Sequence, residues 1–181
     1  TFFPYPRVVQ QIFWAAGTNL ERELEMVRLD PNYRIIFGQG GHLDATGDVA
    51  KMEKEIAALA PQDVPGFRRF LTENRTKLER MLPCLEQPFL GWRDLLNRRL
   101  LKMLPMLRPH QSVDRYLARF FQDPRMRLAF SFQSKYLGMS PFRCPSLFSI
   151  LSFLEFEYGV FHPVCGCNAL TTALALVAAR L

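Results

Sequence analysis

The feature that most constrains the fold is the apolar run near the end of the chain, residues 169–179, which reads ALTTALALVAA. Nine of its eleven residues are apolar, and only Thr171 and Thr172 are polar. With about 3.6 residues per turn, a helix of this composition is apolar on nearly every side and must be buried on nearly every side. We therefore expect much of its cover to come from sequence beyond these 181 residues, and we interpret the chain as a piece of a longer protein.

Hydrophobic spacing predicts a mostly helical α+β chain with a small β-hairpin or sheet. Residues 25–37 are rich in branched and aromatic side chains and are broken at Asp30-Pro31-Asn32, which predicts two short strands joined at a turn. The following Gly38-Gln39-Gly40-Gly41 has Leu43 where a GxGxxG phosphate loop needs its third glycine, so we interpret it as a hairpin turn. We expect helices over about 5–16, 48–60, 64–82, 91–107, 112–121, 125–137, 145–156 and 168–180.

The middle of the chain is strongly basic. Residues 61–127 contain 14 Lys or Arg against 7 Asp or Glu, whereas the rest of the chain contains 9 against 10. Within 95–108 one helical face is aliphatic and the other cationic, which is typical of a helix lying at a membrane surface. The alternative is an ordinary surface helix whose leucines face the core. The residues of the predicted membrane contact are Leu96, Arg98, Arg99, Leu100, Lys102, Met103, Leu104 and Leu107.

Other partners and settings are disfavoured by the sequence. The cations lie among long aliphatic side chains and no nucleic-acid-binding motif is present, so we expect no nucleic-acid partner. The sequence contains no run of about 18 apolar residues, so it predicts no membrane-spanning helix. Four cysteines are too few for a disulfide scaffold, and Cys165-Gly166-Cys167 lacks the usual zinc spacing. We interpret the cysteines as buried free thiols in a reducing, cytoplasmic setting, with no metal site.

Two short segments carry candidate chemistry. Asp123-Pro124 is typical of a helix start, with Asp123 as N-cap, and Asp123 also lies four residues from Arg127, with which it could form an acid–base pair. His162-Pro163 follows a segment with two carboxylates and could relay protons, or could be a packed loop residue. No Ser-His-Asp set, P-loop or HExxH motif is present, so these residues alone leave the function open.

A family resemblance narrows the choice. The segments SFQSKYLGMSPF (131–142), LFSIL (147–151) and EFEYGVFHP (155–163) occur in this order. Together they resemble the bacterial-type phytoene desaturase family, FAD-dependent carotenoid desaturases related to the flavin amine oxidases. The similarity extends over the whole chain, from Thr1-Phe2-Phe3-Pro4 onward.

The resemblance implies the substrate-domain portion of a two-domain FAD-dependent oxidoreductase, with residues 1–181 forming an isoprenoid-binding part. About 61–127 would be its membrane-facing helical region. The Rossmann-like FAD domain would lie outside this sequence, which contains no GxGxxG, so FAD is expected in the complete protein but not on this chain alone. The implied partners are a long isoprenoid or carotenoid substrate, a membrane surface and the missing FAD domain.

The resemblance also implies site residues. Asp123 and Arg127 match an acidic and basic pair near the flavin end of the substrate tunnel, and His162, Pro163 and Gly166 match a segment that returns toward the cofactor. The family usually carries Gly-Gly where this chain has Cys165-Gly166. If the first glycine lets the backbone approach the flavin, a side chain at Cys165 could clash with it.

Three functional hypotheses follow. The first is part of an FAD-dependent desaturase that introduces double bonds into an isoprenoid such as phytoene, peripheral to the membrane and inactive as this fragment. The second is a non-catalytic helical module that binds lipid or protein. The third is another flavin amine oxidase-like oxidoreductase.

Overall fold

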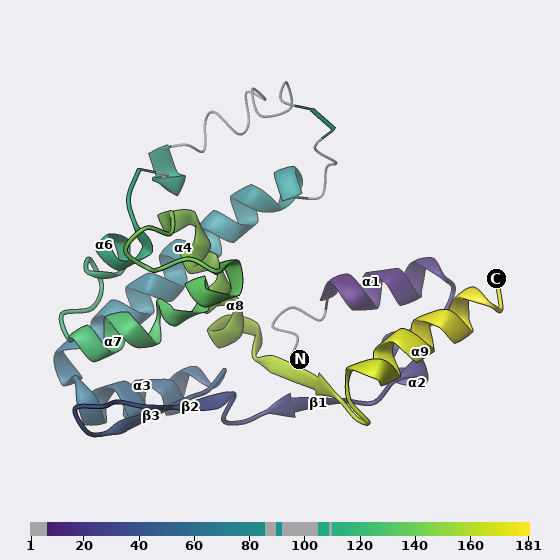
Figure 1. Cartoon of the computed structure of the whole chain (residues 1–181), viewed down its shortest axis with the longest axis horizontal. Helices are drawn as coiled ribbons and strands as arrows, with labels where there is room; N and C mark the ends of the chain where they lie inside the picture. The colour runs from purple at the N-terminus through teal and green to yellow at the C-terminus, as the bar shows by residue number, and fades with distance from the viewer. Residues whose placement is uncertain (1–6, 86–89, 92–104, 109) are drawn as a thin grey trace. The chain divides into compact units, whose positions relative to one another are not determined.

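In a computed structural model, the chain is described over residues 7–85, 90–91, 105–108 and 110–181 (Figure 1). These residues form two compact units. Unit 1 contains the described residues up to 35 together with 44–52 and 154–181, and unit 2 contains 36–43 and the described residues of 53–153. The chain passes between them in the hairpin β2 (Tyr33–Ile36) and β3 (His42–Ala45), in α3 (Val49–Leu59) and in α8 (Ser149–Tyr158).

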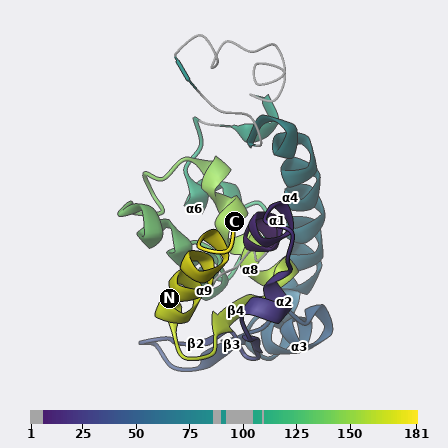
Figure 2. The same ribbon diagram turned by 90° about the vertical axis from the view of Figure 1, so that its right-hand side faces the viewer.

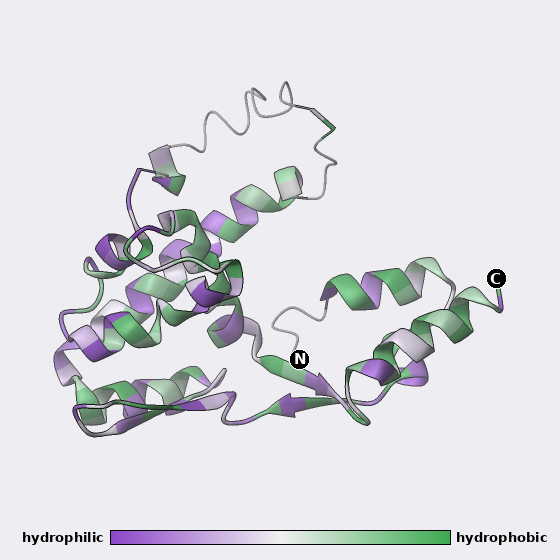
Figure 3. Cartoon of the chain, viewed as in Figure 1, coloured by the Kyte–Doolittle hydropathy of each residue, from purple (hydrophilic) through white to green (hydrophobic). Residues whose placement is uncertain are grey.

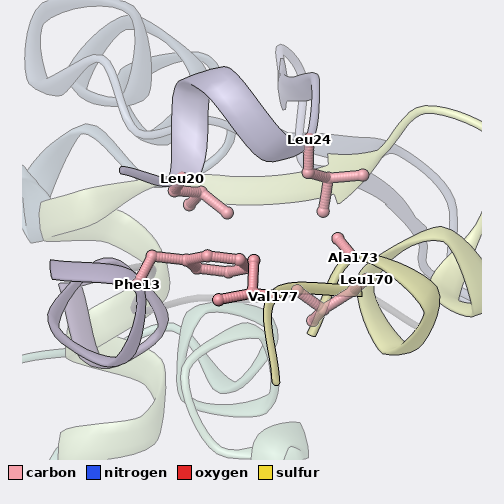
Figure 4. Packing of buried hydrophobic residues seen from close by; sticks show 6 residues of the cluster. All are labelled: Phe13, Leu20, Leu24, Leu170, Ala173 and Val177. Carbon is pink, nitrogen blue, oxygen red and sulfur yellow. The ribbon is translucent and has the colours of Figure 1, made fainter. Parts of the chain in front are cut away.

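Unit 1 is held together by one helix cluster and one pair of strands. Helices α1 (Arg7–Ala15), α2 (Leu20–Glu23) and α9 (Cys167–Ala178) meet in an apolar cluster, in which the Phe13 ring points toward Val177 (Figure 4). Strands β1 (Met26–Leu29) and β4 (Val160–Pro163) pair antiparallel, with Met26 opposite Pro163 and Leu29 opposite Val160. The cluster consists of Phe13, Leu20, Leu24, Leu170, Ala173 and Val177.

The described residues cover α9 only in part, and cover by sequence outside these 181 residues stays a prediction. The helix is apolar over most of its length (Figure 3), but only Leu170, Ala173 and Val177 are buried. These side chains are three and four residues apart and therefore form one stripe, while Leu176 on another side is 60% exposed. Within the part of the chain that the structure describes, α9 is thus covered on one side rather than on nearly every side.

The strands and turn predicted between 25 and 41 are confirmed, with a pairing that the sequence did not indicate. β1 and β2 flank Asp30-Pro31-Asn32 but pair with β4 and β3 respectively, not with each other. The glycine segment is the turn of the β2–β3 hairpin, where the Phe37 amide donates to the Gly41 carbonyl at 3.0 Å. Gly40 and Gly41 both have positive φ, which explains why glycine occupies this turn.

Unit 2 is built around α4 (Val64–Leu85), the long blue helix of Figures 1 and 2. Helices α6 (Val113–Leu117) and α7 (Pro124–Ala129) and the 3₁₀ turns η1 (Pro61–Asp63), η3 (Phe132–Leu137) and η4 (Ser146–Phe148) complete the unit. Ring contacts in its core include Phe121 stacked on Phe130 at a centroid distance of 4.4 Å and Phe70 edge-on to Phe130 at 5.3 Å. The aromatic cluster consists of Phe67, Phe70, Tyr116, Phe120, Phe121 and Phe130.

Most predicted helices are confirmed, with changes at their ends. Asp48, at the start of the helix predicted over about 48–60, caps α3 by accepting hydrogen bonds from the Ala50 and Lys51 amides. The predicted helix 112–121 ends at Leu117, and the predicted helix 125–137 is interrupted because the backbone of Phe130 leaves the helical region, with φ −97° and ψ 1°. The helix predicted over 91–107 lies mostly outside the described residues. Its last three residues, 105–107, are described and are helical.

The close approach of α4 to the chain after α6 gives a direct test of this packing. A Cβ at Gly66 would overlap the carbonyl group of Phe120, which is backbone and has little room to move. We expect Gly66→Ala to lower the free energy of unfolding by more than about 3 kcal/mol. Gly38→Ala is the matched control, because its Cβ meets no atom within 4 Å. Urea unfolding in which Gly66→Ala is as stable as Gly38→Ala would contradict the packing.

Candidate functional site

The N-terminus of α7 is fixed by a buried carboxylate that sequence reasoning missed. Asp63 is fully buried in η1, and its two oxygens accept from the backbone amides of Gln122 and Asp123 at 2.8 and 2.9 Å. Buried carboxylates are retained where they satisfy backbone donors. Asp63 therefore holds the backbone that carries the candidate residue Asp123. Nothing in the local pattern around Asp63 distinguishes it from a solvent-exposed loop aspartate.

Asp123 is both a helix cap and one partner of an ion pair. Its Oδ1 accepts from the Arg125 amide at 2.7 Å, which confirms the predicted N-cap with Pro124 at the first helical position. Its Oδ2 pairs with Nη2 of Arg125 at 2.7 Å, and this hydrogen bond holds the pKa of Asp123 below its usual range. The guanidinium also donates to the Leu59 carbonyl at 2.8 Å, so it joins α3 to α7.

The acid–base pair that spacing suggested between Asp123 and Arg127 is not formed. The carboxylate turns toward the helix N-terminus to cap it, and this places it beside Arg125 instead. Arg127 is half-buried, and among the described residues its guanidinium has no ion-pair partner. Of the two roles that the sequence allowed for Asp123, the structure confirms the helix cap and does not form the pair with Arg127. The catalytic roles of Asp123 and Arg127 stay predictions.

An apolar hollow of about 310 Å³ lies beside this ion pair. It runs between the hairpin turn and α7, with the Phe37 side chain in its wall and the Arg125 guanidinium as its one charged group among the described residues. A mostly apolar hollow with few polar groups is suited to a hydrocarbon segment. The lining residues are Phe37, Gly38, Gln39, Pro124, Arg125 and Leu128.

The second predicted segment, His162 to Gly166, belongs to unit 1. His162 and Pro163 lie in β4 opposite Val27 and Met26, and the chain then turns into α9. Cys165 has φ 66° and Gly166 has φ 82°, so both residues adopt a backbone conformation that favours glycine. A glycine at the Cys165 position would be unstrained.

The thiols differ from the prediction that all four are buried. Cys84 and Cys144 are buried, and burial raises the pKa of Cys144. Cys165 is exposed and Cys167 is half-buried, and neither residue belongs to the apolar cluster of unit 1. All four are free thiols, as predicted.

Of the predicted membrane-contact residues, the structure describes only Leu107. Leu96, Arg98, Arg99, Leu100, Lys102, Met103 and Leu104 lie outside the described residues. Leu107 is 5% exposed and packs with Met81 and Cys84 in a small apolar cluster. In the described part of the chain, no helix is both long and apolar enough to cross a membrane.

A buried cation next to the aromatic core is the second feature that sequence reasoning missed. The side chain of Lys77 is 1% exposed, and its Nζ lies 3.6 Å from the centroid of the Tyr116 ring and 3.8 Å from Oε1 of Glu73. Burial is the main cause that lowers the pKa of Lys77 to about 8. The negative charge of Glu73 opposes this shift, and the positive charges of Arg119 and Arg108 add to it. Burial, reinforced by Glu73, raises the pKa of Tyr116.

Comparison with known proteins identifies the relatives of this chain. It is 34% identical over 180 residues to a 4,4'-diapophytoene desaturase (4,4'-diapolycopene-forming) of Methylomonas sp., a match to 99% of this chain and 35% of that protein. It is 33% identical over 174 residues to a zeta-carotene-forming phytoene desaturase of Myxococcus xanthus, covering 96% of this chain and 34% of the relative. A lycopene-forming phytoene desaturase of Pseudescherichia vulneris is 35% identical over 172 residues, a match to 93% of this chain and 34% of that protein. No protein-family model matches the chain.

By their names, these relatives are desaturases that act on phytoene or diapophytoene. The chain belongs to the carotenoid desaturase family and spans about a third of the length of the curated relatives it matches.

The cap of α7 can be tested by two substitutions at one position. Asp123→Ala removes both the cap and the ion pair with Arg125, and we expect it to lower the free energy of unfolding by about 2 kcal/mol. Asp123→Asn keeps an oxygen that can accept from the Arg125 amide, so its loss should be about half as large. Equal stability of both variants and the parent chain in urea unfolding would contradict the role of Asp123.

The buried cation predicts a pH dependence of stability. Because the folded chain has a lowered Lys77 pKa of about 8 and an unfolded lysine titrates near 10.4, the unfolded chain binds more protons between these values. Stability attributable to Lys77 therefore rises with pH in this window. The free energy of unfolding of the parent chain, relative to Lys77→Met, should rise by about 2 kcal/mol from pH 7 to pH 10. Lys54→Met, at an exposed position, should show no such difference. A pH-independent difference for Lys77→Met would contradict a titrating buried lysine.

Proposed function

We propose that this chain is the isoprenoid-binding part of an FAD-dependent carotenoid desaturase. The observation that carries the proposal is the apolar hollow beside the Asp123–Arg125 ion pair. The names of the relatives give phytoene, diapophytoene and zeta-carotene as their substrates. A polyene precursor is a hydrocarbon, so it needs an apolar channel with few polar groups. The hollow holds one segment of such a chain between Phe37 and Leu128.

The reaction takes a hydride from one carbon of the isoprenoid and a proton from the neighbouring carbon, which leaves a new double bond. FAD, bound by the complete protein, supplies the hydride acceptor. The residues of this chain position the hydrocarbon and place charged side chains near it. Asp63 fixes the α7 N-terminus, and the Asp123–Arg125 pair closes one end of the hollow. Arg127, which has no ion-pair partner among the described residues, is the basic group to which we assign a role in the reaction.

The turn from β4 to α9 fits a backbone approach to the flavin. A Cβ built at Gly166 meets no described atom within 4 Å, so this backbone is open to a flat ring. His162 and Pro163 lead into the turn on the paired strand β4. The exposed thiol of Cys165 lies beside this backbone, and replacement by glycine is compatible with its positive φ.

The nucleotide-binding part of the enzyme belongs to the portion of the relatives that this chain does not match. Unit 1 offers exposed apolar side chains on α1 and α9 as a surface for that part, among them Ile12, Trp14 and Leu176, each at least half exposed. Burial of such side chains against a second domain removes apolar surface from water. The cationic amphipathic segment 95–108 would place the protein at the membrane surface, from which a hydrocarbon substrate is drawn.

The proposal can be tested by transplantation. This chain would replace the matching third of the lycopene-forming phytoene desaturase of Pseudescherichia vulneris, and the chimera would be assayed on phytoene with product analysis by chromatography. We expect desaturated products. Arg127→Gln in the chimera should lower turnover at least tenfold, because the substitution removes a charge that we place near the reacting bond.

The control is Arg115→Gln, an exposed arginine at the surface of α6, which should stay within twofold of the chimera. A folded chimera that carries flavin but makes no product would contradict the proposal and favour a non-catalytic lipid- or protein-binding module. Products formed equally well by Arg127→Gln would show that the basic residue has been assigned wrongly. Products from a non-carotenoid substrate alone would identify another flavin oxidoreductase of the amine oxidase type.

A further inference from the structure

Unit 2 has a second and larger cavity, of about 830 Å³, whose charge is strongly one-sided. Five arginines line it, against the single carboxylate of Glu73. Met106 and Phe120 add apolar wall. The arginines are Arg68, Arg69, Arg80, Arg108 and Arg119, from α4 and from the segments on either side of α6.

Three of the five arginines have no carboxylate partner in the described chain. Arg68 forms an ion pair with Glu53 of α3, and Arg119 forms one with Glu73 at 3.2 Å. Arg69 and Arg108 have no described ion pair, and Arg80 reaches only the sulfur of Met106, at 3.8 Å. Guanidinium groups gathered without counter-charges raise the local positive potential and favour binding of an anion.

The cavity-lining residues of α4 include a row along one side of the helix. Arg68, Thr72, Thr76 and Arg80 follow one another at four-residue steps, so they lie on one side of the helix over about 18 Å. Thr72 and Thr76 donate their hydroxyl protons to helix carbonyls. The donors left for a ligand are therefore the arginines.

Arg108 enters the cavity from a strained backbone. Its φ is +46°, a conformation that residues with a side chain rarely adopt. Two hydrogen bonds hold the Arg108 carbonyl, from the buried hydroxyl of Ser146 at 2.9 Å and from the Gln111 amide at 2.9 Å. Strain that the surrounding structure maintains occurs preferentially at functional sites. The buried Lys77 lies behind Glu73 and feels the charges of Arg108 and Arg119, so the positive potential extends beneath the cavity wall.

We propose that this cavity binds a phosphoryl group through Arg69, Arg80 and Arg108. A phosphate offers several acceptor oxygens to guanidinium donors, and bidentate contacts between them are stronger than neutral hydrogen bonds. The phosphoryl group belongs either to the headgroup of an anionic phospholipid or to a soluble phosphate compound. The inference stands on the cavity alone and does not depend on the proposed desaturase activity.

Binding of inorganic pyrophosphate to the 181-residue chain tests the site, measured by isothermal titration calorimetry at fixed ionic strength. We expect saturable binding that Arg69→Gln/Arg80→Gln weakens at least tenfold. The matched control is Lys54→Gln/Arg115→Gln, which removes the same charge from exposed positions that do not line the cavity and should change the affinity less than twofold. Thermal unfolding of each variant establishes that it is folded before binding is compared.

Flotation with vesicles distinguishes the two sources of the phosphoryl group. Binding to phosphatidylglycerol vesicles that the cavity variant loses and that pyrophosphate displaces, with none to phosphatidylcholine vesicles, would support a lipid headgroup. Pyrophosphate binding that the cavity variant loses, without vesicle binding, would support a soluble phosphate. Binding to neither, or an equal loss in the cavity and control variants, would overturn the proposal.

Discussion

The interaction on which unit 2 depends is the packing of α4 onto the aromatic rings of the following segments. The Phe67 ring contacts Phe130, and the Phe70 ring contacts Phe120, Phe121 and Phe130, with edge-on or tilted ring planes. Such contacts bury large apolar areas and fix the spacing between elements. Gly66 lets the helix approach the Phe120 backbone directly. Once this packing is fixed, both candidate sites of unit 2 take their positions from it.

The same helix serves two different surfaces. Its apolar side chains face the aromatic core, and its opposite side presents the arginines of the large cavity. At the start of α4, η1 supplies Asp63, which holds the backbone before α7 and so the Asp123–Arg125 pair. The apolar hollow and the arginine-lined cavity are thus placed by one structural unit.

The sequence predicted local structure well and contacts between distant segments poorly. Most of the predicted helices, the Asp123 cap and the glycine hairpin depend on neighbouring residues, and these were confirmed. The pairing of β1 with β4, the carboxylate of Asp63 and the burial of Lys77 involve segments dozens of residues apart. A spacing of four was compatible with an Asp123–Arg127 pair, but capping geometry selected Arg125. The family resemblance came from ordered motifs, which single positions could not provide.

The central claim is that the hollow beside Asp123–Arg125 receives an isoprenoid chain. Photolabelling of the 181-residue chain with a diazirine-bearing isoprenoid, followed by peptide mass spectrometry, tests it most directly. The account predicts that label concentrates on residues 37–39 and 124–128 and is displaced by unlabelled phytoene. Label spread over exposed apolar residues such as Trp14 and Leu176, with no displacement, would contradict it.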